Sequence, residues 1–222
     1  MKLALFDLDH TLLPLDSDHA WGEFTIELGW HEGSAFRAMN DRFYDQYKMG
    51  SLNLAEYIAF TTEGIRRMGK DAALAAHRRF MAEVITPAIT PQALALLQQH
   101  RDAGDTLVLI TATNEFVTRP IAQALGFEHL LAVELQTGAD GWYNGQIQGV
   151  PSFREGKVTR LANWLAERGS HLNHIERSVF YSDSINDLPL LEQVQKPVAT
   201  NPDAHLLSIA QERGWPVLNL FS

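Results

Sequence analysis

The residues Leu3-Ala-Leu-Phe6, followed at once by Asp7-Leu-Asp9-His-Thr11, decide the fold. A short apolar run without a polar interruption is typical of a central parallel strand that is covered on both faces. Open α/β sheets bind their ligands beyond the carboxyl ends of such strands. The stretch therefore predicts a buried first strand with candidate site residues at its end, although two aspartates and a threonine also suit a solvated turn.

Further apolar runs alternate with helical patterns in the second half of the chain. Thr90 and Pro91 form a helix start, and Gly104 ends that helix before the next strand. Between residues 130 and 152, glycines alternate with bulky apolar residues, which favours a β-hairpin. The alternation of strands and helices predicts the fold class α/β with a parallel sheet. The expected strands are residues 106–110, 178–181 and 198–199, and the expected helices include residues 91–101 and 158–168.

This alternation stops between residues 14 and 86, where helical patterns follow one another without a strand-like run. Asn53 and Glu56 have the spacing of a capping-box variant at the start of one of these helices. We therefore expect an all-helical cap domain over residues 14–86. It is inserted into a core domain that consists of residues 1–13 and 87–222.

The composition argues against several classes of function. The chain has 222 residues, 45% hydrophobic and 20% charged, as expected for one large globular domain or a domain with an insertion. Its 18 Lys and Arg against 27 Asp and Glu give a net charge of −9, which disfavours nucleic acid and acidic membranes as partners. The sequence contains no cysteine, so thiolate metal sites and cysteine nucleophiles are excluded. No apolar run approaches the roughly 20 residues that span a bilayer, and we expect a cytoplasmic protein.

A second pair of carboxylates, Asp183 and Asp187, follows the apolar run Ser178-Val-Phe-Tyr-Ser182. Alone, this segment is equally typical of a helix N-cap with an acidic first turn. Two aspartate pairs at the same edge of one sheet would raise one another's pKa unless a cation neutralised them. Because the chain has no cysteine and no H-E-x-x-H motif, oxygen ligands predict Mg²⁺ rather than zinc.

Two further segments suit an anionic ligand. Thr111-Ala-Thr-Asn114 follows the run 107–110 and leaves a hydroxyl and backbone N–H groups at a strand end, which fits a phosphate cradle or a plain strand end. Gly156 and Lys157 open a helical pattern, and the helix dipole does not favour a cation there. A nearby anion explains this lysine, although an ordinary surface lysine fits as well.

These four segments, in this order on an α/β core with a helical insert after the first, resemble the haloacid-dehalogenase (HAD) superfamily of phosphatases. The chain looks most like the phosphoserine-phosphatase-like branch over nearly its whole length. The resemblance implies a Rossmann-like parallel-sheet core with an inserted helical first cap, and Mg²⁺-dependent hydrolysis of a small phosphorylated metabolite. The residues that carry it are Asp7, Asp9, Thr111, Lys157, Asp183 and Asp187.

The resemblance also implies a role for each of these residues. Asp7 would attack phosphorus and form an aspartyl-phosphate, and Asp9 would protonate the leaving alkoxide and later deprotonate the attacking water. Lys157 and Thr111 would offset charge on the phosphoryl group. We expect Thr11 to be structural, with its hydroxyl supporting the loop.

The same resemblance implies the metal ligands. Asp7, the main-chain carbonyl of Asp9, and Asp183 would hold Mg²⁺, while Asp187 would orient the metal ligands. Asn186 would contact the phosphate or the attacking water.

The substrate is indicated by the resemblance at two places. Asp16 lies where phosphoserine phosphatases carry the acidic residue that binds the substrate ammonium. Their cap arginine, which binds the serine carboxylate, has no counterpart, because residues 52–64 contain no Arg or Lys and an ungapped reading finds Ala59 and Thr61. The opening Asp16-Ser-Asp-His-Ala-Trp-Gly22 resembles a bacterial subgroup with histidinol-phosphate phosphatase activity. We therefore favour histidinol phosphate, which has an amine and an imidazole but no carboxylate, over phosphoserine.

Aromatic residues of the cap would stack on the imidazole, although aromatic residues at helical spacing more often belong to a core. The candidates are Trp21, Phe24, Phe43, Tyr44 and Tyr47.

Other readings stay open. A dehalogenase shares the nucleophile but has no use for Asp9 as an acid, and a phosphomutase returns the phosphoryl group to a sugar. A phospho-receiver switch uses a similar acidic cluster but has no aspartate two residues after its acceptor and no cap. A purely structural module leaves the four segments unexplained. Residues 64–70 match a P-loop up to Lys70, but Asp71 follows and no strand precedes it, so we reject a nucleotide site there.

Overall fold

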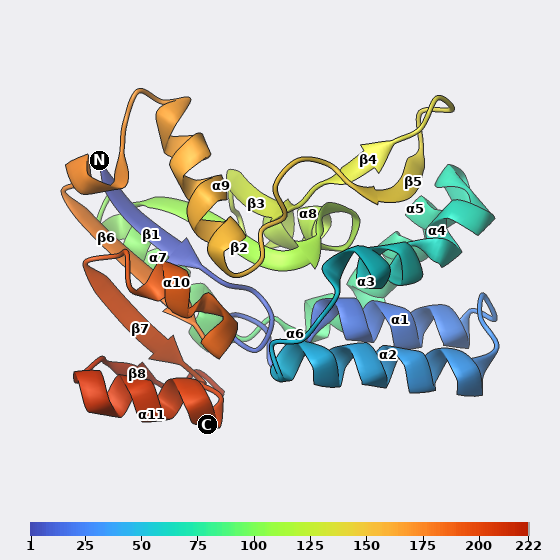
Figure 1. Cartoon of the computed structure of the whole chain (residues 1–222), viewed down its shortest axis with the longest axis horizontal. Coiled ribbons are helices and arrows are strands. Elements are labelled where there is room, and N and C mark those ends of the chain that lie inside the picture. Colours follow the sequence, from blue (N-terminus) through green and yellow to red (C-terminus); the bar gives the residue numbers. More distant parts are fainter. Residues whose placement is uncertain (222) are drawn as a thin grey trace.

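Six parallel strands form the central sheet of the computed structural model, which describes residues 1–221 (Figure 1). The central strand β1 (Lys2–Phe6) pairs on one side with β2 (Thr106–Asn114) and on the other with β6 (Arg177–Ser182). The strand order is β3-β2-β1-β6-β7-β8, where β3 is His129–Val133, β7 is Lys196–Thr200 and β8 is Val217–Leu218. The carboxyl ends of β1, β2 and β6 therefore lie at one edge. The predicted α/β class is confirmed.

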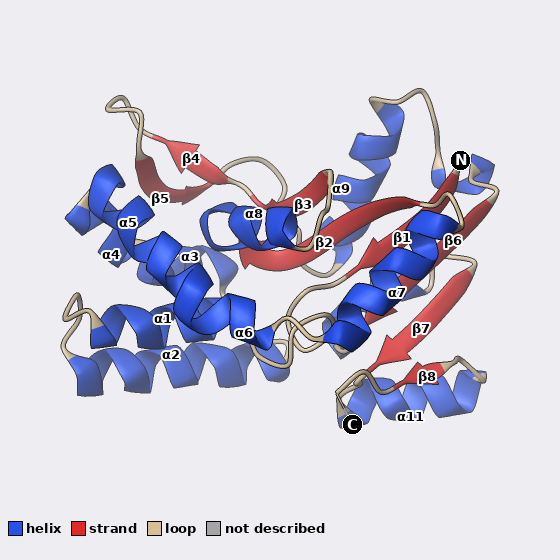
Figure 2. Ribbon diagram, turned by 180° about the vertical axis from the view of Figure 1, so that it is seen from behind, coloured by secondary structure: helices blue, strands red, loops and turns tan. Residues whose placement is uncertain are grey.

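Helices cover both faces of this sheet. They are α7 (Pro91–Asp102), α8 (Glu115–Ala124), α9 (Glu155–Ala166), α10 (Leu188–Leu191) and α11 (Ala204–Arg213). Ala4 and Phe6 of β1 belong to one hydrophobic cluster with α7 and α8, whereas Leu3 and Leu5 belong to a second cluster with α9, α10 and α11. Figures 1 and 2 show α9 and α10 on one side of the sheet and α7 on the other. Burial on both faces explains why β1 has no polar interruption.

The segment before α7 is helical, as expected. It contains α1 (Ser17–Glu27), α2 (Gly33–Lys48), α3 (Leu54–Thr61), α4 (Glu63–Met68), α5 (Lys70–Phe80), the π-helical turn η1 (Met81–Ile85) and α6 (Thr86–Ala88). The Asn53 side chain accepts a hydrogen bond from the Glu56 N–H and caps α3. Trp21 and Phe80 of this segment share a hydrophobic cluster with Val117 of α8. The division into a core and a cap at residues 14 and 86 stays a prediction.

The predicted hairpin is confirmed, with β4 (Leu135–Thr137) antiparallel to β5 (Tyr143–Ile147). The Trp142 indole N–H donates to the Ile65 carbonyl at 2.9 Å, and β5 packs against α3 and α4. The expectation that the excursion begins at residue 130 is wrong, because residues 130–133 form β3 of the main sheet. This Leu-Leu-Ala-Val run has the unbroken apolar character of a parallel strand.

Two smaller corrections concern element ends. α9 covers Glu155–Ala166, which includes the expected opening at Gly156 and Lys157 but ends before residue 168, and β8 was not expected. Short 3₁₀ turns, η2 (Leu172–His174) and η3 (Ile185–Asp187), flank β6. Within residues 1–221, no single helix is long and apolar enough to cross a membrane; only the segments Lys70–Ala88 and Pro91–Asp102, which meet at 86°, pass that test as a bent pair.

Candidate active site

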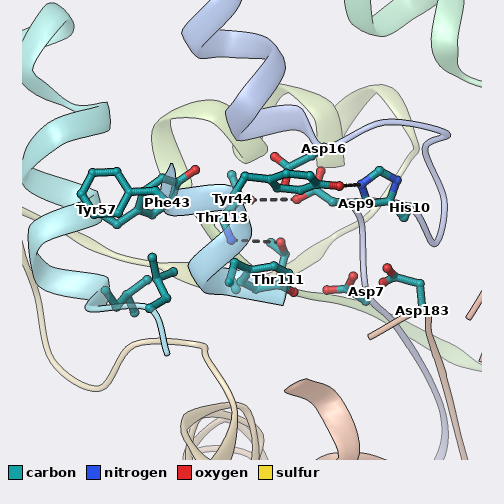
Figure 3. A pocket seen from close by; sticks show the side chains of 14 residues that line it. Asp7, Asp9, His10, Asp16, Phe43, Tyr44, Tyr57, Thr111, Thr113 and Asp183 are labelled. Carbon is teal, nitrogen blue, oxygen red and sulfur yellow. Dashed lines mark hydrogen bonds between the residues drawn. The ribbon is translucent and has the colours of Figure 1, made fainter. Parts of the chain in front are cut away.

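A cavity opens at the edge of the sheet where β1, β2 and β6 end, between these strands and the helices α2 and α3 of the helical insert. Asp7 and Asp9 follow β1, Thr111 lies near the end of β2, and Asp183 follows β6. Figure 3 shows the carboxylates of Asp7 and Asp183 side by side, with Thr111 next to them. The residues that line the cavity are Asp7, Asp9, His10, Asp16, Phe43, Tyr44, Tyr47, Leu52, Leu54, Tyr57, Thr111, Ala112, Thr113 and Asp183.

A buried lysine is held between two aspartates at the base of this site. The Lys157 Nζ lies 2.7 Å from the Asp7 carboxylate and 2.7 Å from that of Asp187. Burial opposes the charge on Lys157, but Asp187 and Asp7 together raise its pKa above the usual value, so the lysine stays cationic. Asp187 also accepts a hydrogen bond from Ser182 at 2.7 Å. The helix start that carries Lys157 thus delivers a cation to Asp7.

Asp7 and Asp183 meet on either side of a hydroxyl. The Thr11 Oγ1 lies 3.1 Å from Asp183 Oδ1 and 3.5 Å from Asp7 Oδ2. Burial, followed by the charges of Asp7 and Asp187, raises the pKa of Asp183 well above its usual value. Thr11 is therefore not only a loop support, because its hydroxyl contacts both carboxylates. One hydroxyl proton cannot serve two carboxylates at once.

The donor set at this point fits Mg²⁺. Mg²⁺ is usually bound by one or two carboxylates together with water, and a cation between Asp7 and Asp183 would offset the charges of two carboxylates whose pKa values are raised first by burial and next by neighbouring carboxylates. Within residues 1–221, three or more acidic or histidine side chains do not converge on one point. The carboxylate of Asp9 instead accepts a hydrogen bond from Thr113, so only the main-chain carbonyl of Asp9 remains as a candidate ligand. The carboxylate of Asp187 contacts Lys157.

The Asp9 carboxylate is held by two hydrogen bonds. It accepts from the Ser17 N–H at 2.7 Å and from the Thr113 hydroxyl at 2.8 Å. Burial, followed by the charge of Asp16, raises the pKa of Asp9 to about 7. The hydrogen bonds from Ser17 and Thr113 act in the opposite direction and lower this pKa. Burial likewise raises the pKa of Asp7 to about 7, although Lys157 opposes the shift. A carboxyl group with a pKa near neutrality suits general acid–base catalysis.

The remaining predicted residues lie close by but differ in their contacts. Thr111 Oγ1 accepts from the Thr113 N–H at 3.1 Å, so its own proton stays available to a ligand. Asp16 caps α1 by accepting from two backbone N–H groups, and it lines the cavity. Asn186 donates to the Tyr47 carbonyl of the cap at 2.9 Å. The structure brings all of these residues to one region, and their catalytic roles stay predictions.

Three aromatic candidates line the cavity and two do not. Phe43, Tyr44 and Tyr47 on α2 face it. Trp21 and Phe24 belong to the hydrophobic core instead, where the Trp21 ring packs 5.2 Å from Phe80, so for these two residues the core role expected of aromatic residues at helical spacing holds. Their spacing on α1 does not reveal which face turns to the cavity, because this depends on how α1 packs.

Sequence reasoning missed three residues that shape the site: Thr113, Tyr57 and Asp18. Thr113 lies two residues after Thr111, and this alternation along a strand is a signal that places both side chains on one face. Asp18 follows Asp16 at the start of α1, is 2% exposed and accepts a hydrogen bond from the Asn114 amide at 3.2 Å. Burial raises its pKa to about 8, with a further contribution from Asp16. No local sequence signal marks Tyr57.

Comparisons with known proteins agree with this geometry. The family model of haloacid dehalogenase-like hydrolases matches residues 4–192. A protein of Neisseria meningitidis serogroup C (strain 8013) named histidinol-phosphatase is 46% identical over 218 residues, covering 98% of each chain. Phosphoserine phosphatase SerB1 of Mycobacterium tuberculosis (strain H37Rv) is 31% identical over 220 residues, covering 96% of this chain and 69% of that protein.

Solved structures show the same fold. A protein of unknown function from Bordetella pertussis Tohama I superposes with a TM-score of 0.93 at 47% identity and covers 99% of both chains. A substrate-bound phosphoserine phosphatase superposes with a TM-score of 0.64 at 18% identity, covering 98% of this chain and 92% of that one. The chain belongs to the family of haloacid dehalogenase-like hydrolases.

Proposed function

We propose that this protein is a Mg²⁺-dependent phosphomonoester hydrolase that acts on histidinol phosphate. The observation that carries the reaction is the position of Asp7, a buried carboxylate paired with Lys157 at 2.7 Å and adjacent to Asp183. The observation that favours the substrate is the 46% identity with histidinol-phosphatase over nearly the full length.

Asp7 is the nucleophile in this proposal. A carboxylate oxygen of Asp7 attacks phosphorus in line while the P–O bond to the alcohol breaks, which gives an aspartyl-phosphate and splits the hydrolysis into two displacements. Lys157 orients one oxygen of Asp7 through its hydrogen bond. The Thr111 hydroxyl donates a hydrogen bond to a phosphoryl oxygen. Asp7, Asp183 and the main-chain carbonyl of Asp9 would hold Mg²⁺, which would supply Lewis-acid stabilisation of the phosphoryl charge. Asn186 orients the phosphate or the attacking water.

Asp9 moves the proton. It donates to the leaving alkoxide in the first displacement and removes a proton from water in the second, and its pKa of about 7 allows both states near neutral pH. The hydrogen bonds from Ser17 and Thr113 fix the carboxyl group on the side of the cavity that faces Asp16. The attacking water then cleaves the aspartyl-phosphate, which releases inorganic phosphate and restores Asp7.

The lining of the cavity supports a substrate with a cationic leaving group. Aspartates line it, and no Lys or Arg is among its lining residues. A substrate carboxylate would therefore lack a charge-assisted hydrogen bond, which is worth about 1.5–3 kcal/mol. Asp16 binds the amine in this proposal, and the aromatic wall of Phe43 and Tyr44 accommodates a planar ring.

Release of inorganic phosphate from histidinol phosphate and from phosphoserine, each with Mg²⁺ and with EDTA, tests the proposal. We expect Mg²⁺-dependent turnover and a kcat/KM at least tenfold higher for histidinol phosphate. A preference for phosphoserine would reject the substrate but keep the reaction. Undiminished activity in EDTA would reject the proposed dependence on Mg²⁺. A long-lived phosphoryl-enzyme without turnover would favour a receiver-like switch. The cytoplasmic setting stays a prediction.

A further inference from the structure

The cavity has two chemically different ends. Figure 3 shows Asp7 and Asp183 at one end and Tyr57 with Phe43 at the other. When a phosphoryl group reaches Asp7, the leaving group has to extend towards the end formed by Tyr57 and Phe43. Tyr57 lies on α3, and its ring packs 5.4 Å from that of Phe43 at an end of the cavity that Leu52 and Leu54 also line.

A buried carboxyl group lies beside Tyr57. Asp18 is 2% exposed, and its Oδ1 accepts from the Asn114 amide. Its Oδ2 is buried and has no hydrogen-bond partner within residues 1–221. The Tyr57 hydroxyl is close enough for the two groups to shift each other's pKa: burial, and next Asp18, raises the pKa of Tyr57, while Tyr57 lowers that of Asp18. A buried oxygen without a partner calls for a further hydrogen bond, and the Tyr57 hydroxyl is the neighbour that can provide one.

The surrounding charges decide which head group suits this end. After burial, the charges of Asp16 and Asp9 further raise the pKa of Asp18. Tyr57 likewise has Asp16 and Asp9 among the charges that raise its pKa. A substrate carboxylate is repelled here, whereas a nitrogen heterocycle brings a neutral or positive ring with polar atoms at its edge.

We propose that Tyr57 is a specificity-determining residue whose hydroxyl binds the ring nitrogen of a nitrogen-heterocyclic leaving group, and that Asp18 is the positioning residue that orients this hydroxyl. The inference rests on the proposed function and adds the contact that recognises the ring. When Asp18 is ionised, Tyr57 donates to it and accepts from a ring N–H. When Asp18 is protonated, it donates to Tyr57, which then donates to the ring nitrogen that carries a lone pair. Imidazole offers both kinds of nitrogen.

Steady-state kinetics of Tyr57→Phe and Asp18→Asn with two substrates test the inference. The substrates are histidinol phosphate and O-phosphoethanolamine, which keeps the amine and the phosphate but lacks the ring. We expect Tyr57→Phe to raise the KM for histidinol phosphate about fivefold to tenfold, the effect of one lost hydrogen bond, with kcat within about twofold. For O-phosphoethanolamine, kcat and KM should both stay within about twofold. Asp18→Asn should give the same pattern with a smaller increase in KM.

Matched controls lie outside the cavity. Tyr143→Phe removes a tyrosine hydroxyl from the hairpin, and Asp71→Asn removes an exposed carboxylate from α5; neither should change either substrate's KM. Equal losses of Tyr57→Phe on both substrates, or no loss on histidinol phosphate, would overturn the inference while the proposed function stands. If the wild-type enzyme does not prefer histidinol phosphate to O-phosphoethanolamine, the proposed substrate fails and the ring contact fails with it. Should Asp18→Asn not fold, the Tyr57→Phe comparison alone decides.

Discussion

At the scale of single residues, Asp7 gives the sharpest prediction. Asp7→Asn keeps the shape of the side chain and removes the nucleophilic charge, so we expect turnover to fall by on the order of 10³-fold or more. The fold should stay intact, because the substitution removes a buried charge and Lys157 keeps its contact with Asp187 at 2.7 Å. Phosphate release and the thermal unfolding midpoint of the purified variant measure both effects. Activity near the wild-type level would remove Asp7 from its role.

Asp18 makes the stability of the protein depend on pH. Burial raises the pKa of Asp18 in the folded state to about 8 from an ordinary value of 3.8, so between these values the folded state binds more protons than the unfolded state. The favourable contribution of the protonated group is complete below about pH 4 and is lost as the pH rises through 8. Asp18→Asn removes this dependence.

We therefore expect Asp18→Asn to stabilise the protein relative to wild type at about pH 8.5 and to have less effect at about pH 5. Thermal unfolding midpoints of both proteins, with the exposed Asp71→Asn as a control, measure the difference. A difference that does not change between the two pH values would show that Asp18 is already ionised in the folded state.

At the scale of secondary-structure elements, the start of α9 determines where Lys157 lies. A Cβ at Gly156 would meet the Pro151 carbonyl oxygen at 2.0 Å, a backbone contact that no side-chain movement relieves. Gly156→Ala must therefore shift the first turn of α9 and move Lys157 away from Asp7. We expect kcat to fall at least tenfold and the unfolding midpoint to fall by several degrees.

Gly33 is the matched control, because it also lies at the start of a helix and a Cβ there meets only the Ile26 Cγ2 methyl, at 3.2 Å, rather than backbone. Gly33→Ala should leave kcat within about twofold. If Gly156→Ala kept wild-type kcat, the position of Lys157 would not depend on this close approach.

Elements whose signals are local could be predicted from the sequence. β1 follows from an unbroken apolar run, and α7 follows from Thr90, Pro91 and Gly104. The residues at the ends of β1, β2 and β6 could be grouped because parallel strands end at one edge of a sheet. The wall of the cavity could not be predicted, since Tyr57 on α3 and Asp18 on α1 influence each other's pKa although they lie far apart in the sequence. The same limit explains why Trp21 proved to belong to the core.

At the scale of the whole molecule, the helical insert contacts the sheet and its loops beside the site. The His10 ring nitrogen lies 3.1 Å from the Tyr44 hydroxyl, the Asn186 amide donates to the Tyr47 carbonyl, and the Arg154 guanidinium donates to the Gly50 carbonyl at 3.0 Å. Tyr44 and Tyr47 lie in the C-terminal half of α2, and Gly50 lies just after this helix. The net charge of −9 does not prevent binding of an anion, because Lys157 is local and salt screens more distant carboxylates over roughly 8 Å.

The cation should stabilise the whole fold. Without it, burial and neighbouring carboxylates (Asp187 and Asp9 for Asp7, Asp7 and Asp187 for Asp183) raise the pKa values of Asp7 and Asp183, which means that their ionised forms destabilise the folded state at neutral pH. A ligand that binds only the folded state adds about 2.7 kcal/mol at a concentration 100 times its Kd. For a chain of this length we therefore expect Mg²⁺ to raise the unfolding midpoint by about 5–10 °C over EDTA.

Asp183→Asn separates this effect from any other action of Mg²⁺. It removes one of the two carboxylates that face Thr11, so the metal-free variant should be at least as stable as the metal-free wild type, and the increase with Mg²⁺ should disappear. Asp71→Asn, exposed on α5, should keep the full increase. If Asp183→Asn also kept it, Mg²⁺ would bind elsewhere on the molecule. Protonation, rather than a metal, would then relieve the repulsion between Asp7 and Asp183. In that case the activity should be insensitive to EDTA, and it should fall as the pH rises and the shared proton is lost.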